Sequence, residues 1–165
     1  MARAFPTFAL RPFLADDTEM LAEIFRASIT ELTADDYSEA QQDAWMAAAD
    51  DEDAFRDRLS ARLTLIATLD GSPIGFASLA DGREIDMLYV HPAAAGRGAG
   101  AMLVDALEKL AQAHGATRLT VDASDTARPF FEKRGWTAQR RNTVSRGDEW
   151  LATTTLDKTL AKARS

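Results

Sequence analysis

The chain has 165 residues, of which 46% are hydrophobic, and a formal net charge of −7. This length suits one domain with one core, and the acidic balance argues against the basic face of a nucleic-acid-binding protein. Because the chain contains no cysteine, a disulfide framework, a thiolate metal site and a cysteine nucleophile are excluded. We expect a single domain over residues 1–165, with its core at about 8–160 and no metal. Neither a membrane-spanning stretch nor a signal peptide is recognisable, so we expect residence in the cytoplasm and no membrane partner.

Acidic residues are concentrated between positions 35 and 57, where nine carboxylates are opposed only by Arg56. One interpretation is a solvated helical surface. The other is an electrostatic funnel that attracts a cationic substrate.

The first sixty residues predict one strand followed by helices. The strand covers residues 8–11, and residues 51–59 predict a further helical turn or two. Between them lie two pairs with the spacing of a helix capping box, in which each side chain satisfies a free backbone amide. These pairs are Asp16 with Glu19 and Ser38 with Gln41.

The middle of the chain predicts an antiparallel meander of three strands, at residues 63–69, 74–79 and 84–90. Turn sequences separate them, including Asp81-Gly82. In the third strand, Ile85, Leu88 and Val90 do not share one face of period two, which a β-bulge near Met87 would reconcile.

A glycine-rich loop then leads into a long helix that we expect to end at Gly115. A strand at residues 119–121 follows, parallel to its predecessor if the helix crosses over. A short helix at about 127–134 and strands near 137–144 and 150–156 complete the pattern. The order of elements predicts the α+β class, with a mixed sheet.

The glycine loop indicates an anion site, because amides at a helix start are unpaired and glycine lets an anion approach them closely. The loop also fits Gly96-x-Gly98-x-x-Ala101, a variant of the dinucleotide fingerprint, with Asp122 placed to bind a ribose. The antiparallel strands before the loop, and the few residues after Asp122, argue against that alternative.

Two segments resemble the acetyl-CoA motifs of the GNAT superfamily of N-acetyltransferases. They are residues 84–100, which read EIDMLYVHPAAAGRGAG, and residues 127–136, which read ARPFFEKRGW. The resemblance implies a mixed, mostly antiparallel seven-stranded sheet, flanked by about four helices and containing a splayed parallel strand pair. It also implies acetyl-CoA as the acetyl donor and an amine as the acceptor.

The resemblance assigns site residues by position. Pantetheine would pair with the backbone around Leu88 to Val90, and the pyrophosphate would meet the glycine loop. The cofactor-binding residues implied are Leu88, Tyr89, Val90, Ala95, Gly96, Arg97, Gly98, Ala99, Gly100, Ala101, Ser124, Ala127, Phe130 and Phe131. The early helices would supply acceptor contacts from Phe25, Tyr37 and Trp45.

The implied reaction is attack of a neutral amine on the thioester. An alkylammonium has a pKa near 10.4, so the neutral amine costs roughly 4.6 kcal/mol at pH 7, and a general base must take the proton. The resemblance makes Glu84 the first candidate for that base and Asp86 the second. It assigns the backbone amide of Leu88 to the oxyanion.

Three positions depart from the family pattern. Ala95 stands at the first loop position, Ser124 replaces the usual asparagine, and Phe131 replaces the tyrosine that protonates the leaving thiolate. Tyr89 or a water would have to substitute as the acid. These departures keep open a second function, a non-catalytic acyl-CoA-binding sensor. The sequence leaves open whether the protein is a monomer or a homodimer.

Overall fold

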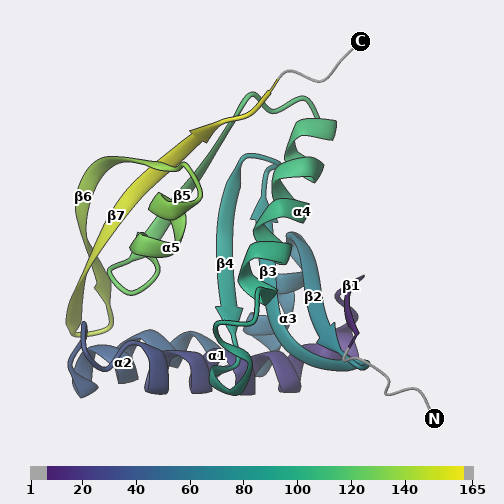
Figure 1. The fold of residues 1–165 in the computed structure, drawn as a ribbon. Coiled ribbons are helices and arrows are strands. Elements are labelled where there is room, and N and C mark those ends of the chain that lie inside the picture. Colours follow the sequence, from purple (N-terminus) through teal and green to yellow (C-terminus); the bar gives the residue numbers. More distant parts are fainter. Residues whose placement is uncertain (1–6, 162–165) are drawn as a thin grey trace.

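The computed structural model describes residues 7–161, in which seven strands form one sheet in the order β1-β2-β3-β4-β5-β7-β6 (Figure 1). Every neighbouring pair is antiparallel except β4 with β5. The strands are β1 (Phe8–Pro12), β2 (Leu63–Leu69), β3 (Ser72–Ala80), β4 (Glu84–Val90), β5 (Arg118–Ser124), β6 (Thr137–Arg146) and β7 (Glu149–Thr159). The expected α+β class and meander are confirmed. A single parallel pair among the described strands is incompatible with the doubly wound sheet of the dinucleotide alternative.

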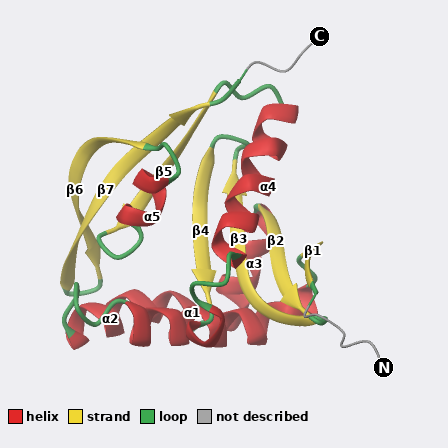
Figure 2. Cartoon of the chain, viewed as in Figure 1, coloured by secondary structure: helices red, strands yellow, loops and turns green. Residues whose placement is uncertain are grey.

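Within residues 7–161, five α-helices accompany the sheet (Figure 2). They are α1 (Thr18–Leu32), α2 (Glu39–Met46), α3 (Glu52–Ala61), α4 (Ala99–Ala113) and α5 (Arg128–Lys133). The resemblance implied about four helices, and the additional one is α3, which forms where one or two helical turns were expected at residues 51–59. Asp51 caps α3 by accepting a hydrogen bond from the Ala54 amide. Among residues 7–161, no helix combines the length and apolarity needed to cross a bilayer.

The two expected capping boxes have different outcomes. Ser38 and Gln41 satisfy each other's backbone amides and begin α2 as predicted. The box expected from Asp16 and Glu19 does not form. A 3₁₀ turn at Ala15–Asp17 precedes α1 instead, and Asp17 accepts hydrogen bonds from Arg11 and from the Leu14 amide.

Helices cover both faces of the sheet (Figures 1 and 2). On one face, the apolar side of α4 packs over β3 and β4 through side chains such as Leu103 and Leu107. On the other face, α1 and α3 bury Phe25 and Phe55 against Phe76 of β3. The two hydrophobic cores pack against opposite faces of the central strands. The carboxyl ends of β4 and β5 lie beside these cores.

The expected β-bulge lies in β4. Ser78 pairs with Met87, but the next residue, Leu79, pairs with Ile85, so Asp86 is the extra residue. The bulge reverses the alternation of the strand, since Ile85 faces the core of α4 and Met87 faces the core of α1. Tyr89 therefore lies on the α1 side.

Candidate active site

The parallel strands β4 and β5 diverge after a very short ladder. They pair only at Glu84 with Thr120 and at Ile85 with Val121. Beyond these pairs, the strands separate toward the carboxyl end of β4 (Figure 1). The divergence leaves backbone groups of β4 without a strand partner on that side, so an extended ligand could take the place of the missing ladder.

A cavity of about 250 Å³ occupies this divergence. Its wall contains eight of the residues that the sequence assigns to the cofactor: Leu88, Tyr89, Val90, Gly100, Ser124, Ala127, Phe130 and Phe131. Gly100 forms the wall where it approaches Phe130, because an added Cβ would lie 3.5 Å from the Phe130 ring. The cavity is thus a largely apolar slot between two strands and the start of α4.

The other six assigned residues, at positions 95–99 and 101, form the adjacent loop and first turn of α4. Gly96 and Gly98 have φ angles of +80° and +94°, which L side chains rarely adopt. No side chain caps the helix start, and the first helical bond runs from the Met102 amide to the Gly98 carbonyl. The amides of residues 99–101 therefore remain free for an anion. Arg97 beside them is exposed, and no acid within residues 7–161 pairs with it.

The two candidate bases have different surroundings. Asp86 lines the cavity, but both its oxygens accept hydrogen bonds from Arg58, at 3.0 and 3.1 Å, and Arg62 lies 3.7 Å away. Glu84 lies beyond the cavity wall. Burial raises the pKa of Glu84, and the charges of Asp86 and Asp122 raise it further. Glu84 is therefore a stronger proton acceptor than an ordinary glutamate, but it does not line the cavity.

Tyr89, the candidate acid, lies in the wall of the cavity. Its hydroxyl oxygen accepts a hydrogen bond from Trp45 Nε1 at 3.1 Å, and no other hydrogen bond to it is found within residues 7–161. Burial raises the pKa of Tyr89 to about 12. The hydroxyl therefore keeps its proton at neutral pH. Phe131, by contrast, is 1% exposed and contributes only its ring to the cavity wall.

A second cavity of about 100 Å³ adjoins the first. The three residues expected to contact the acceptor, Phe25, Tyr37 and Trp45, all line it. The wall common to both cavities consists of Trp45, Asp86, Tyr89, Asp122 and Ser124. Two compartments that share a wall suit a reaction between two bound molecules.

Sequence reasoning missed several residues of this second cavity. Arg58 on α3 and Arg146 on β6 line it, as does Asp122 of β5. Asp122 attracted attention only as a ribose ligand in the rejected dinucleotide alternative. The two arginines come from elements far apart in the chain, and neither belongs to a motif.

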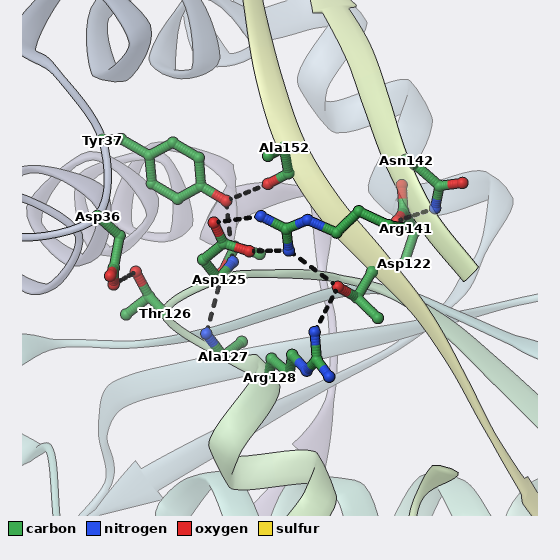
Figure 3. A network of polar contacts seen from close by, with 12 residues as sticks. Asp36, Tyr37, Asp122, Asp125, Thr126, Ala127, Arg128, Arg141, Asn142 and Ala152 are labelled. Carbon is green, nitrogen blue, oxygen red and sulfur yellow. Dashed lines mark hydrogen bonds and ion pairs between the residues drawn. The ribbon is translucent and has the colours of Figure 1, made fainter. Parts of the chain in front are cut away.

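A polar network holds the loop between β5 and α5 (Figure 3). The Tyr37 hydroxyl accepts a hydrogen bond from the Asp125 amide at 2.9 Å and donates one to the Ala152 carbonyl. The Asp125 carboxylate pairs with Arg141 of β6. The Ser124 hydroxyl, at the usual asparagine position, accepts from the Ala127 amide at 3.1 Å. The network thus positions a segment that lines the first cavity.

Comparisons with known proteins agree with this geometry. A family model described as an acetyltransferase (GNAT) domain matches residues 33–154. The uncharacterized N-acetyltransferase YafP of Escherichia coli (strain K12) is 33% identical over 142 residues, which are 86% of this chain and 89% of that protein.

Solved structures share the fold. A GCN5-related N-acetyltransferase from Rhodopseudomonas palustris is 61% identical, with a TM-score of 0.92 over 97% of this chain and 99% of that one. The PaiA N-acetyltransferase from Thermoplasma acidophilum, solved in complex with coenzyme A, is 20% identical, with a TM-score of 0.77 over 93% and 99% of the two chains. The chain belongs to the GNAT family of acetyltransferases.

Proposed function

We propose that this protein transfers the acetyl group of acetyl-CoA directly onto a primary amine of a small molecule or peptide. The observation that carries the proposal is the cavity between β4 and β5, which connects a free helix start to a second, aromatic-lined cavity. A donor with an anionic end and a long thin arm fits the first compartment. An amine fits the second.

The glycine loop would bind the pyrophosphate through the amides of residues 99–101, and Arg97 would add positive charge. The departure at Ala95 does not weaken this binding, because backbone groups make it. The backbone of Leu88 to Val90 would pair with pantetheine where β5 has separated from β4. Ser124, Ala127, Phe130 and Phe131 would form the opposite wall.

In the transfer itself, the amine nitrogen forms a bond to the thioester carbonyl carbon and the carbon–sulfur bond breaks. The Leu88 amide would stabilise the oxyanion between these events. Glu84 would accept the amine proton through a water, favoured by its raised pKa. Asp86 is the second candidate, but Arg58 occupies its oxygens. Tyr89 would donate its proton to the leaving thiolate.

The acceptor would lie against Phe25, Tyr37 and Trp45 in the second cavity. The run of acidic residues across α2 and α3 would attract a cationic group toward this end of the molecule. These contacts support an acceptor with an apolar body and a positively charged amine.

The alternative is a sensor that binds acyl-CoA without turnover, favoured by Phe131 in place of the usual tyrosine. Two measurements separate the functions. A thermal shift with acetyl-CoA and CoA tests the cofactor site, and release of the free CoA thiol against a panel of amines tests catalysis. Stabilisation by both nucleotides with no thiol release above the rate of hydrolysis would support the sensor and contradict the enzyme.

A further inference from the structure

The second cavity contains four charged groups, and only two of them neutralise each other. Arg58 and Asp86 form a two-pronged ion pair. Asn142 Nδ2 donates to Asp122 Oδ1 at 3.2 Å, and no basic group in the described part of the chain forms an ion pair with Asp122. Arg146 donates to the carbonyl of Ser145, and within residues 7–161 no acid lies within 4 Å of it.

The two unneutralised charges have opposite signs and different places in the cavity. Asp122 belongs to the wall shared with the first cavity, where the reacting nitrogen must lie. Arg146, at the end of β6, lines only the second cavity. Arg146 also acts on Tyr89: burial raises the pKa of that hydroxyl most, while the charges of Arg58 and Arg146 lower it. Arg146 is thus an exposed cation that lines the second cavity and whose charge reaches the Tyr89 hydroxyl.

We propose that the acceptor is zwitterionic, a small molecule of the amino acid class whose amine faces Asp122 and whose carboxylate faces Arg146. This inference rests on the proposed function, because it takes the second cavity as the acceptor site. A guanidinium binds a carboxylate with paired, charge-assisted hydrogen bonds. The aromatic and aliphatic wall, which includes Trp45 and Leu151, would cover the apolar body between the two charges.

The test uses binding, so it does not depend on turnover. The full-length protein is saturated with CoA and titrated calorimetrically with straight-chain amino acids from glycine to aminohexanoate, and with alkylamines of the same lengths. At the chain length that spans the cavity, we expect the amino acid to bind roughly tenfold more tightly than its alkylamine. Added salt should reduce that ratio, because Arg146 is exposed.

Arg146→Glu should remove the preference for the carboxylate and favour diamines instead. Lys109→Glu makes the same change of two charges on α4, outside both cavities, and should leave the preference unchanged. Equal affinity of amino acids and alkylamines, an unchanged ratio in Arg146→Glu, or no binding by any member of the amino acid series would overturn the inference. Amino acid binding without any release of CoA thiol from acetyl-CoA would contradict the proposed transfer and leave the acceptor class standing.

Discussion

The hydroxyl of Tyr37 donates a hydrogen bond to the carbonyl oxygen of Ala152 at 2.6 Å, joining the segment between α1 and α2 to strand β7. The same hydroxyl accepts from the Asp125 amide, so a single oxygen ties together three parts of the chain (Figure 3). Tyr37 is only 5% exposed, and its ring lies edge-on to Trp45. This junction holds the β5–α5 loop beside the second cavity, which Tyr37 lines.

Tyr37→Phe should therefore affect both stability and cofactor binding. The phenylalanine ring keeps the packing against Trp45 but leaves the Asp125 amide and the Ala152 carbonyl without their partner. We expect a loss of about 1–3 kcal/mol in the free energy of unfolding, measured by urea denaturation. The KM for acetyl-CoA should rise more than kcat falls, because the loosened loop lines the cofactor cavity. An unchanged KM in a destabilised variant would show that the junction is only structural.

Gly98→Glu tests the phosphate site. The φ of +94° at Gly98 disfavours any side chain, but no atom lies within 4 Å of an added Cβ. A carboxylate there would repel a diphosphate at the helix start, so calorimetry should detect no acetyl-CoA binding. Gly98→Ala is the matched control, since it carries the same backbone strain of about 1–2 kcal/mol without the charge. If Gly98→Glu and Gly98→Ala bind acetyl-CoA with equal affinity, the added charge has no effect, and the pyrophosphate does not bind at this helix start.

Tyr89→Phe tests the proposed acid. The change keeps the ring contacts with Phe25 and Phe76 and removes the hydroxyl. We expect kcat to fall at least about tenfold, with the KM for acetyl-CoA nearly unchanged, in a steady-state assay of thiol release.

Phe131→Tyr provides the rescue. It restores a hydroxyl at the position that the family usually fills with tyrosine, on the cofactor cavity wall. In the double variant Tyr89→Phe/Phe131→Tyr, we expect kcat to recover part of the loss. If Tyr89→Phe keeps the wild-type kcat, the leaving thiolate takes its proton from water.

Local sequence patterns were enough to predict most of the fold. The strands at residues 63–69 and 84–90 have the predicted bounds, because each is a short apolar run bounded by turn sequences. The bulge in β4 was predicted because Ile85, Leu88 and Val90 do not share one face of period two. The expected cap at Asp16 does not form because Asp16 lies inside the 3₁₀ turn, and Asp17, bound by Arg11 of the preceding strand, is the residue before α1.

The second cavity could not be predicted in the same way. Two of its four charged groups are Arg58 of α3 and Arg146 of β6, which are 88 positions apart in the chain and come to one cavity only in the folded structure. Tyr37 and Ala152 are 115 residues apart in the chain. Long-range pairs of this kind leave no local pattern, whereas the cofactor side depends on contiguous backbone and was recognisable from the glycine loop.

Glu84→Gln tests the base. Since burial raises the pKa of Glu84, wild-type activity should increase with pH through a value above that of an ordinary glutamate. Glutamine cannot accept the proton, so we expect kcat of the variant to fall about a hundredfold below pH 8. At higher pH the variant's kcat should recover, because more of the amine acceptor is already neutral. Acetyl-CoA affinity should not change. Glu23→Gln, an exposed position on α1, is the control. A larger loss in Asp86→Asn than in Glu84→Gln would assign the base to Asp86.

The two tyrosines of the chain predict its behaviour in alkali. Burial raises the pKa of both, and that of Tyr89 reaches about 12, whereas a tyrosine in the unfolded chain ionises near 10. Above pH 10 the unfolded state therefore loses protons that the folded state retains. The tyrosine contribution to the free energy of unfolding is fully present below pH 10 and is lost between about pH 10 and 12. Tyr89 alone accounts for a loss of about 1 kcal/mol at pH 11. Urea unfolding at pH 8.5 and pH 11 measures this loss, and phenolate absorbance should appear only with unfolding. Tyr89→Phe should lose less stability over the same interval than wild type, and an equal loss would show that other groups dominate the alkaline transition.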